Sequence, residues 1–285
     1  MMKQMILNIR KNVLIKNSFG IKSKSSFFVE PRTIDEIFDC LKFAKENKLL
    51  LNILGKGTNT LICKDKIKGL IIKIDKNLSK HQIQGEIMTF QSGVELSEAS
   101  RIALNQGLSG LEFAEGIPGT IGGAIFGNSG AFGESIGALV QKVKIIDIDK
   151  LILKERKNLK FSHRNSNLKI NKDIIVEVEL KLEKKNKKFI KEKMDFFREK
   201  RKQSQPKEKS VGCIFKNNQA GKIIDELGLK GTKIGNAEIS NKHANFVVNK
   251  GNATGFDVLE LIRIIKKKAK EEKNINLDLE INILK

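Results

Sequence analysis

A glycine-rich stretch at residues 116–133, with the sequence GIPGTIGGAIFGNSGAFG, limits the backbone conformations open to this chain more than any other segment. Seven of its eighteen residues are glycine. Glycine loses more backbone entropy on folding than other residues, so such density is typical of chain that adopts positive φ or approaches a ligand with its own amides. Flexible linkers are polar throughout, whereas Ile117, Ile121 and Ile125 recur between these glycines. We therefore predict an ordered phosphate-binding loop.

A second glycine element follows an apolar, strand-like segment at residues 50–54. Its sequence is Gly55-Lys56-Gly57-Thr58-Asn59-Thr60-Leu61. The element lacks the third glycine of the dinucleotide fingerprint and the spacing of the Walker pattern, so a standard Rossmann or P-loop site is disfavoured. Two amide-rich loops in one chain instead suggest a pyrophosphate held between them.

Length and composition bound the class of protein. At 285 residues the chain exceeds what one core usually fills, so we expect two or three domains. No apolar run approaches a bilayer span, and residues 1–15 lack the layout of an export signal. The three cysteines, Cys40, Cys63 and Cys213, have no metal-ligand spacing. We expect a soluble, cytoplasmic protein with no membrane insertion, no disulfides and no metal.

The formal charge of +21 raises the alternative of a protein that binds nucleic acid or a membrane surface. Lysines recur along the whole chain, however, and no Trp or Tyr is present to stack bases. We therefore expect no nucleic-acid partner and interpret the charge as a background bias that aids binding of an anionic nucleotide. The alternative predicts a colourless protein whose polyanion binding depends strongly on salt.

Hydrophobic periodicity indicates an α+β chain. A capping box at residues 33–36 opens a helix that precedes the first glycine element. Further helices are predicted at 96–104, ending near Gly107, and at 189–202, 220–227 and 256–272. Strands are predicted at 69–74, 88–90, 143–148, 174–182, 243–248 and 277–284. A polar, charged change of composition at Gln205-Pro206 indicates a domain boundary.

Five motifs resemble, in order, those of the UDP-N-acetylenolpyruvoylglucosamine reductase (MurB) family. The resemblance spans the chain from about Asn12 to Glu280, and several independent motifs agree. They are Gly55-x-Gly57-Thr58-Asn59-x-Leu61, Gly116-Ile117-Pro118-Gly119-Thr120-x-Gly122-Gly123-Ala124, Phe161-x-x-Arg164-x-Ser166, Gly212-Cys213-x-Phe215-Lys216-Asn217 and His243-Ala244-Asn245-Phe246.

The resemblance implies a two-domain FAD-binding scaffold of the MurB/PCMH type and a C-terminal α+β substrate domain. We expect FAD-binding subdomains at residues 1–70 and 71–203 and the substrate-binding domain at 204–285. The implied activity reduces UDP-N-acetylglucosamine enolpyruvate to UDP-N-acetylmuramate with FAD and NADPH, in peptidoglycan precursor synthesis. We expect a monomer that binds FAD without a covalent bond. The implied cofactor-binding residues are Gly55, Gly57, Thr58, Asn59, Thr60, Leu61, Gly116, Ile117, Pro118, Gly119, Thr120, Gly122 and Gly123.

The implied chemistry delivers hydride to C3 of the enol ether and a proton to C2, while negative charge develops toward the carboxylate. Arg164 matches the arginine that stabilises this charge; without the motif it would be an ordinary surface arginine. Cys213 stands where relatives usually have a proton-donating serine, and Asn218 where proline is common. A thiol, with a reference pKa near ~8.5, is mostly protonated at neutral pH and can donate that proton. The alternative for Cys213 is a small packing residue.

Glu280 matches the second catalytic acid of the family, although Asn282 stands where arginine is frequent. A solvated strand face is the alternative, because Asp278 and Asn282 alternate with Glu280. The implied substrate-binding residues, which contact the nucleotide sugar or its diphosphate, are Lys216, Asn217 and His243. The chain has no tyrosine, and His163 stands where many relatives have one. It therefore resembles the subclass without a tyrosine lid.

A rival enzyme class is another flavin oxidoreductase on the same FAD scaffold, one that oxidises an alcohol or a hydroxy acid. Such an enzyme would lack a pocket specific for the sugar nucleotide. The motifs at residues 213–217 and 243–246 favour the sugar nucleotide instead.

Overall fold

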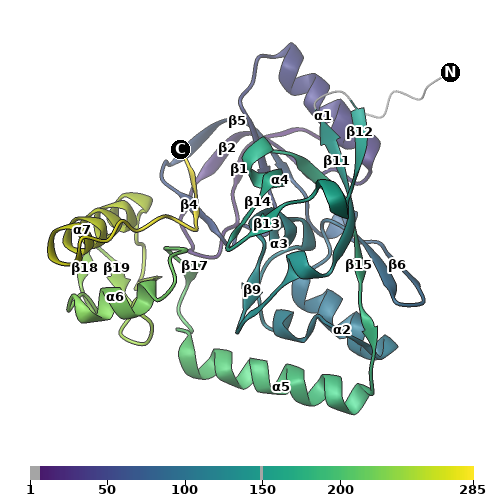
Figure 1. Cartoon of the computed structure of the whole chain (residues 1–285). Coiled ribbons are helices and arrows are strands. Elements are labelled where there is room, and N and C mark those ends of the chain that lie inside the picture. Colours follow the sequence, from purple (N-terminus) through teal and green to yellow (C-terminus); the bar gives the residue numbers. More distant parts are fainter. Residues whose placement is uncertain (1–6, 148–149) are drawn as a thin grey trace. The chain divides into compact units, whose positions relative to one another are not determined.

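A computed structural model describes residues 7–147 and 150–285 of the chain (Figure 1). The chain forms two compact units. The first comprises Met1–Val13, Ser25–Lys56 and Lys68–Glu199, and the second comprises Leu14–Lys24, Gly57–Ile67 and Lys200–Lys285. Because the chain passes between the units several times, these units are not consecutive segments. The division at residues 70 and 203 stays a prediction.

Two sheets form the frame of the first unit. One has the strand order β1-β2-β5-β3, with bounds Arg10–Leu14, Lys24–Val29, Lys66–Lys73 and Leu51–Leu54. The other has the order β12-β11-β15-β7-β6, with bounds Lys150–Glu155, Val140–Asp147, Ile174–Lys181, Ile87–Gln91 and His81–Gln84. The predicted strands at 69–74, 88–90 and 174–182 are confirmed with shifted ends. The strand predicted at 143–148 is confirmed to Asp147, and Ile148 lies outside the described residues.

Helix α1 (Ile34–Glu46) begins where its cap was predicted. The Oγ1 atom of Thr33 accepts a hydrogen bond from the backbone N–H of Glu36 at 3.1 Å. The Glu36 carboxylate accepts the N–H of Arg32 at 2.7 Å. In the usual capping box, the Glu36 carboxylate would accept the N–H of the cap residue Thr33; here it accepts the N–H of the preceding residue.

Helix α2 (Leu96–Gln106) ends at Gly107, whose φ of 68° closes the helix as predicted. Beneath α2 lies a core that includes the fully buried rings of Phe90 and Phe113. A separate core, which includes Ile37 and Ile72, joins α1 to the first sheet. Both sheets of the first unit therefore have a rigid apolar backing.

The glycine-rich stretch contains helix α3 (Ile121–Gly127), so the prediction of a loop was wrong for these residues. Thr120 caps the helix, because its Oγ1 accepts the N–H of Gly123 at 3.3 Å. Burial of Ile121 and Ile125 favours the helix despite the low helix propensity of glycine. A hairpin of β9 (Gly130–Ala131) and β10 (Glu134–Ser135) follows it.

The other elements of the first unit are short, apart from α5, whose residues from Lys200 onward belong to the second unit. Strands β13 (Phe161–Ser162) and β14 (Asn165–Ser166) form a hairpin that leads into α4 (Asn167–Asn171). Strand β8 (Leu108–Ser109) pairs with β16 (Glu183–Lys184), which precedes α5 (Lys187–Ser204), the helix predicted at 189–202. Single 3₁₀ turns lie at Lys76–Leu78, Glu112–Ala114, Ile136–Ala138 and Arg156–Asn158.

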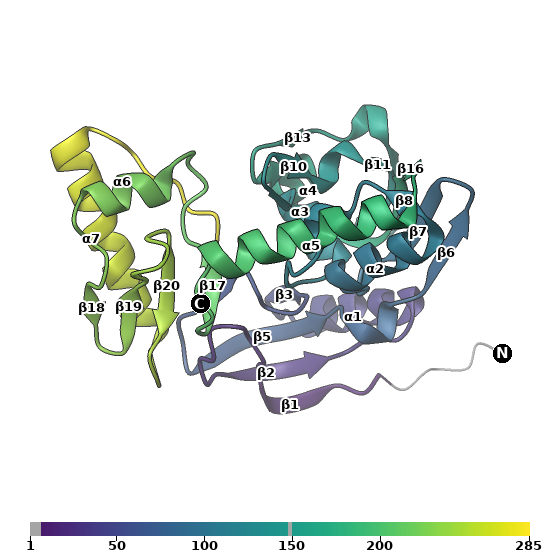
Figure 2. The same cartoon turned by 90° about the horizontal axis from the view of Figure 1, so that it is seen from below.

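The second unit is built on a sheet of order β17-β20-β19-β18. Its strands are Ser210–Cys213, Phe246–Asn249, Ala237–Ile239 and Lys233–Ile234. Helix α7 (Gly255–Lys273) packs on β18 and β19, and α6 (Ala220–Glu226) packs on α7 (Figure 2). Strand β4 (Thr60–Ile62) runs parallel to β21 (Asn282–Leu284). The helices predicted at 220–227 and 256–272 are confirmed.

Two predicted strands of this unit were too long. Residues 243–245 form a turn, in which the N–H of Phe246 donates to the carbonyl of His243 at 2.9 Å, and β20 begins only at Phe246. Residues 277–281 are mostly outside regular strand. They pair with the neighbouring segment only at an isolated bridge between Leu279 and Phe215, which is too short to form a strand. Alternating apolar residues indicate extended chain but not the length over which a partner strand is available.

Candidate functional site

The first glycine element is closely packed at two positions. Gly55 lies in the first unit, where an added Cβ would stand 2.8 Å from the Thr120 Oγ1 atom. Gly57, in the second unit, has a φ of 69°, and an added Cβ would stand 3.2 Å from the carbonyl oxygen of Lys16. Both positions therefore require glycine, for space at Gly55 and for backbone conformation at Gly57.

The second glycine element separates into packing and exposed positions. Gly122 is buried: an added Cβ would stand 2.6 Å from Ser92 Cβ, and its N–H donates to the Ser92 carbonyl at 2.9 Å. Gly123 is exposed, and an added Cβ would meet only Thr120 Oγ1, at 3.5 Å. Gly116 and Gly119, which precede the helix, have φ values of 75° and 135°. The surface without side chains is thus at Gly123 and the preceding loop.

Two buried polar atoms beside this element fit a bound polar group. The Ser92 Oγ and Glu115 Oε2 atoms have no hydrogen-bond partner within the described part of the chain. Glu115 directly precedes Gly116, and its other oxygen pairs with Arg198 at 3.2 Å. Unsatisfied buried polar atoms are costly, so a ligand or water is expected to reach them. The exposed surface at Gly123 suits phosphate, whereas the Glu115 carboxylate repels phosphate and suits a hydrogen-bond donor of a ligand or water.

Arg164 lies in the tight turn of the β13–β14 hairpin, with a half-buried side chain and a φ of 53°. A left-handed backbone is uncommon for arginine and costs about 1–3 kcal/mol where it is enforced. The hairpin is attached to α3 by two bonds: Asn128 Nδ2 donates to the Ser162 carbonyl at 2.8 Å, and Ser166 Oγ to the Phe126 carbonyl at 2.7 Å. Arg164 and the second glycine element therefore share one rigid support.

Cys213 ends β17 just after an irregularity in the sheet. The pairing of β17 with β20 shifts between Ser210 and Cys213, and the intervening Gly212 has a φ of 83°. A bulge of this kind redirects the side chains that follow it. Cys213 is partly exposed, which weakens the interpretation as a buried packing residue.

Glu280 lies on the segment next to Cys213. The backbone N–H of Glu280 donates to the carbonyl of Ile214 at 2.8 Å, and its carbonyl accepts Asn59 Nδ2 at 3.3 Å. The second unit thus brings together Asn59 of the first glycine element, the segment that contains Cys213 and the segment that contains Glu280. Glu280 is half-buried, whereas its neighbour Asp278 is exposed.

Lys216 and Asn217 both contact the segment before Glu280. The Asn217 side chain accepts the N–H of Asp278 at 2.6 Å and donates to the Asn276 carbonyl at 3.0 Å. Lys216 Nζ lies 3.9 Å from an Asp278 carboxylate oxygen at the surface. Asn217 therefore braces the local backbone, and the exposed pair at Lys216 is weak enough to be exchanged for a ligand anion.

His243 is half-buried in the turn before β20, and burial lowers its pKa. Its Nδ1 atom accepts the backbone N–H of Asn245 at 3.3 Å, which places the proton of the neutral ring on Nε2. The ring meets Phe246 edge-on, with 4.9 Å between the ring centres. His243 can therefore offer a neutral N–H donor to a sugar or phosphate oxygen at pH 7.

We expect His243 to make folding depend on pH. Because its folded pKa lies below the unfolded value near ~6.5, its full contribution is present above that value and is lost as pH falls toward the folded pKa. The His243→Gln variant should therefore lose less stability than the wild type between pH 7.5 and 5.5 in urea unfolding. Equal losses in both proteins would contradict a depressed pKa at this position.

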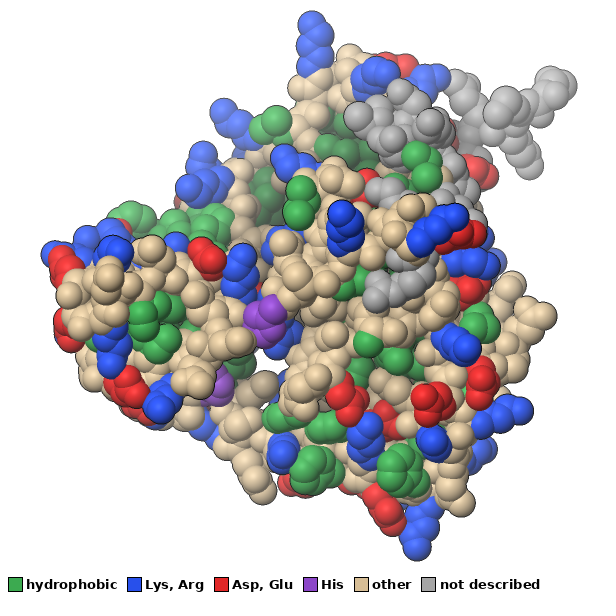
Figure 3. Space-filling model, in the orientation of Figure 1, with side chains coloured by type: hydrophobic (Ala, Val, Ile, Leu, Met, Phe, Trp, Pro, Cys, Tyr) green, Lys and Arg blue, Asp and Glu red, His purple; other side chains and the backbone are tan. Residues whose placement is uncertain are grey.

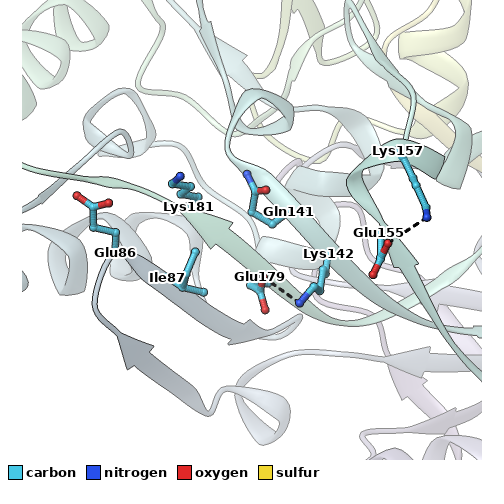
Figure 4. A pocket seen from close by; sticks show the side chains of 8 residues that line it. All are labelled: Glu86, Ile87, Gln141, Lys142, Glu155, Lys157, Glu179 and Lys181. Atoms are coloured by element: carbon cyan, nitrogen blue, oxygen red, sulfur yellow. Dashed lines mark ion pairs between the residues drawn. The ribbon is translucent and has the colours of Figure 1, made fainter.

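A groove of about 660 Å³ lies within the first unit, on the face of the five-stranded sheet opposite its core (Figure 4). Its charges largely neutralise one another: Lys142 lies 3.7 Å from Glu179, and Lys157 lies 3.6 Å from Glu155. The residues that line it include none of the predicted site residues. The groove thus has no charge bias toward an anionic ligand.

The basic residues are spread over the surface. On the face shown in Figure 3, lysine and arginine side chains are scattered among acidic, polar and apolar ones. In the described part of the chain, no helix is long and apolar enough to cross a membrane. No cluster of three or more His, Cys, Asp or Glu side chains suited to a metal occurs among the described residues.

Comparisons with known proteins agree with these features. Residues 205–284 match the family described as UDP-N-acetylenolpyruvoylglucosamine reductase, C-terminal domain, and residues 25–153 match the family described as FAD binding domain. A UDP-N-acetylenolpyruvoylglucosamine reductase of Clostridium novyi (strain NT) is 37% identical over 283 residues, covering 97% of this chain and 92% of the relative. One from Caldanaerobacter subterraneus is 37% identical over 94% of this chain and 90% of its own.

A solved structure is similar over the whole length. The crystal structure of UDP-N-acetylenolpyruvylglucosamine reductase (MurB) from Thermus caldophilus has a TM-score of 0.85 and 30% identity, and the match covers 98% of this chain and 100% of that one. The predicted α+β fold, with its FAD-binding scaffold and C-terminal domain, is thereby confirmed. The chain belongs to the UDP-N-acetylenolpyruvoylglucosamine reductase family.

Proposed function

We propose that the protein reduces UDP-N-acetylglucosamine enolpyruvate to UDP-N-acetylmuramate with NADPH and FAD, as a monomeric cytoplasmic enzyme of peptidoglycan precursor synthesis. The observation that supports this most directly is the convergence within the second unit of segments distant in sequence. Residues 213–217 hydrogen-bond both to the turn at 243–245 and to residues 276–280. These segments hold the residues matched to proton donation and sugar-nucleotide binding.

Each matched residue has a role in the proposal. FAD, when bound, carries the hydride from NADPH to the substrate. Arg164 stabilises the negative charge that develops toward the substrate carboxylate, and the Cys213 thiol donates the proton to C2. Glu280, as the second acid, polarises or protonates the developing enolate. Lys216, Asn217 and His243 hold the nucleotide sugar and its diphosphate. In the proposed division, residues 1–70 and 71–203 hold FAD and residues 204–285 hold the substrate.

Replacement of Gly123 by valine should abolish FAD binding. A branched side chain there meets little of the protein but covers the amides that the phosphates would approach. Gly127→Val is the matched control, since Gly127 is in the same helix and an added Cβ meets nothing within 4 Å. Gly122→Val is unsuitable, because it clashes with Ser92 and would disturb folding. The readout is bound flavin per protein after gel filtration.

Retention of stoichiometric FAD by Gly123→Val would contradict the assignment of this surface to the flavin phosphates. Acid precipitation of the wild-type protein should also release all the yellow colour into solution, because FAD is held without a covalent bond. Colour that stays with the precipitate would mean covalent attachment. A protein that stays colourless after incubation with FAD would contradict flavin binding altogether.

The activity itself is tested by product analysis. Purified protein with FAD and NADPH should convert UDP-N-acetylglucosamine enolpyruvate to a product two hydrogens heavier, identified as UDP-N-acetylmuramate by mass spectrometry and NMR. The rival oxidase class predicts instead that an alcohol or hydroxy acid bleaches the flavin and that the sugar nucleotide is unchanged. Formation of no UDP-N-acetylmuramate by a flavin-loaded protein would refute the proposed substrate.

A further inference from the structure

Asn245 is a buried polar residue that the roles above do not use. It is 5% exposed, and both ends of its side-chain amide contact the same residue, Phe215. Its Nδ2 atom donates to the Phe215 carbonyl at 2.8 Å, and its Oδ1 atom accepts the Phe215 N–H at 2.9 Å. Its own backbone carbonyl accepts the N–H of Ile214 at 2.8 Å, and its N–H donates to His243 Nδ1.

These bonds replace a strand pairing that the sheet does not provide. The regular ladder between β17 and β20 ends at the pair of Cys213 and Phe246, just beyond the bulge at Gly212. Past this point, the side chain of Asn245 pairs with Phe215 as a peptide group of a neighbouring strand would. It extends the ladder by two residues on the β17 side.

A packing role alone does not require this amide. Leucine has a similar branched shape and could fill the space, but it would leave the buried Phe215 N–H and carbonyl without these two partners. Asparagine is favourable here only because both ends are hydrogen-bonded in one orientation, and such bonds fix direction as well as distance. The consequence is a fixed orientation of the peptide at Phe215, which lies between Cys213 and Lys216 in the chain.

We propose that Asn245 is a positioning residue that orients Cys213 and Lys216 for the sugar nucleotide. This role rests on the proposed function. Asn245 acts through the Phe215 peptide and, being buried, does not touch the substrate itself. The bond to His243 Nδ1 is donated by the Asn245 backbone N–H, so it does not depend on the Asn245 side chain.

The first test is the Asn245→Leu variant, which keeps the branched shape of the side chain and removes both of its hydrogen bonds. FAD content and the rate of flavin reduction by NADPH should equal those of the wild type. Reoxidation by UDP-N-acetylglucosamine enolpyruvate should slow by about 10²-fold, as expected for a misplacement of reacting groups by roughly 1 Å. Stopped-flow absorbance separates the two half-reactions.

The second test uses Asn245→Asp, whose effect should depend on pH. An ionised carboxylate accepts the Phe215 N–H but repels the Phe215 carbonyl, whereas a protonated acid can serve both. Burial raises the pKa of such a carboxyl group, so protonation is reached in an accessible range. Reoxidation by Asn245→Asp, divided by the wild-type rate at each pH, should therefore rise as pH falls. The nearby titratable groups are Cys213, Lys216, His243, Asp278 and Glu280, and division by the wild-type rate removes their common effect.

Asn249→Leu is the control for a general loss of rigidity. The Asn249 side chain also hydrogen-bonds to backbone groups with both of its ends: it donates to the Phe19 carbonyl at 2.8 Å and accepts the N–H groups of Gly251 and Ala253. None of these bonds involves Phe215. This variant should lose stability while the ratio of the two half-reactions stays that of the wild type. A similar selective loss of reoxidation in Asn249→Leu would overturn the specific role of Asn245.

A thiol probe distinguishes this role from the proposed function. In a Cys63→Ser background, which removes the other partly exposed thiol, dithionitrobenzoate should modify Cys213 at a changed rate in Asn245→Leu, because the Cys213 side chain is reoriented. If the sugar nucleotide does not reoxidise the flavin of the wild-type protein, the proposed function is wrong. Two outcomes with an active wild-type enzyme would contradict only the positioning role of Asn245. One is unchanged reoxidation and thiol reactivity in Asn245→Leu, and the other is no recovery of Asn245→Asp at low pH. If Asn245→Leu does not fold, the Asn245→Asp profile decides.

Discussion

In the Cys213→Ala variant, NADPH should reduce the flavin at the wild-type rate, while reoxidation by the sugar nucleotide should fall by about 10²- to 10⁴-fold. The alanine removes the proposed donor for C2 and leaves the flavin surface intact. Gly212 and the bulge remain, so the fold of the strand should persist. The two half-reactions, measured separately by stopped flow, show whether the loss is confined to protonation.

The Cys213→Ser variant is the matched control, because serine is the donor usual in relatives and differs by a single atom. It should retain substantial activity. As pH rises through ionisation of the thiol, the wild-type enzyme should lose reoxidation rate, since thiolate has no proton to give. The serine variant should lack this alkaline loss because its hydroxyl does not titrate there. Identical profiles from pH 6 to 10, or full activity of Cys213→Ala, would assign the proton to Glu280 or water.

The Arg164→Ala variant should also lose about 10²-fold or more of the substrate half-reaction. The missing guanidinium acts on charge that develops only while the enolpyruvyl group is reduced. Reduction of the flavin by NADPH should be nearly normal. Alanine in a left-handed turn is strained as arginine is, so the hairpin geometry is comparable in the two proteins.

Arg263→Ala is a suitable control for the loss of one positive charge. Arg263 is exposed on α7 and pairs with Glu260 at 3.0 Å, so its removal should leave both half-reactions unchanged. If Arg164→Ala impairs both half-reactions equally, Arg164 shapes the shared site instead of stabilising charge. A drop in bound FAD would point the same way.

Local sequence signals predicted most of the regular structure. Helix α1 is specified by its Thr33 cap and α2 by its terminal Gly107, and both signals act within a few residues. The helix within the glycine-rich stretch was not predicted, because the low helix propensity of Gly122 and Gly123 is outweighed by the burial of neighbouring isoleucines. Propensity is a local quantity, whereas burial depends on the whole fold.

The sequence suggested candidate site residues, but it did not predict the backbone features and hydrogen bonds that hold them in place. Cys213 and Glu280 were chosen by resemblance, and their assignment stays a prediction. The bulge at Gly212 and the bonds from Asn245 to Phe215 depend on which strand lies alongside, and sequence spacing does not reveal that. Asn245 carried one signal, since asparagine in the apolar run Ala244 to Val248 is a polar residue that must find a partner when buried.

In the proposed reaction, electrons pass from NADPH, through FAD, to the enolpyruvyl sugar nucleotide. The most direct test is an anaerobic double-mixing experiment, in which NADPH first bleaches the flavin and a stoichiometric amount of UDP-N-acetylglucosamine enolpyruvate is then added. The flavin absorbance should return in full, with one UDP-N-acetylmuramate formed per flavin reoxidised. Flavin that stays bleached after addition of the sugar nucleotide, yet is reoxidised by oxygen, would show that the sugar nucleotide is not the electron acceptor.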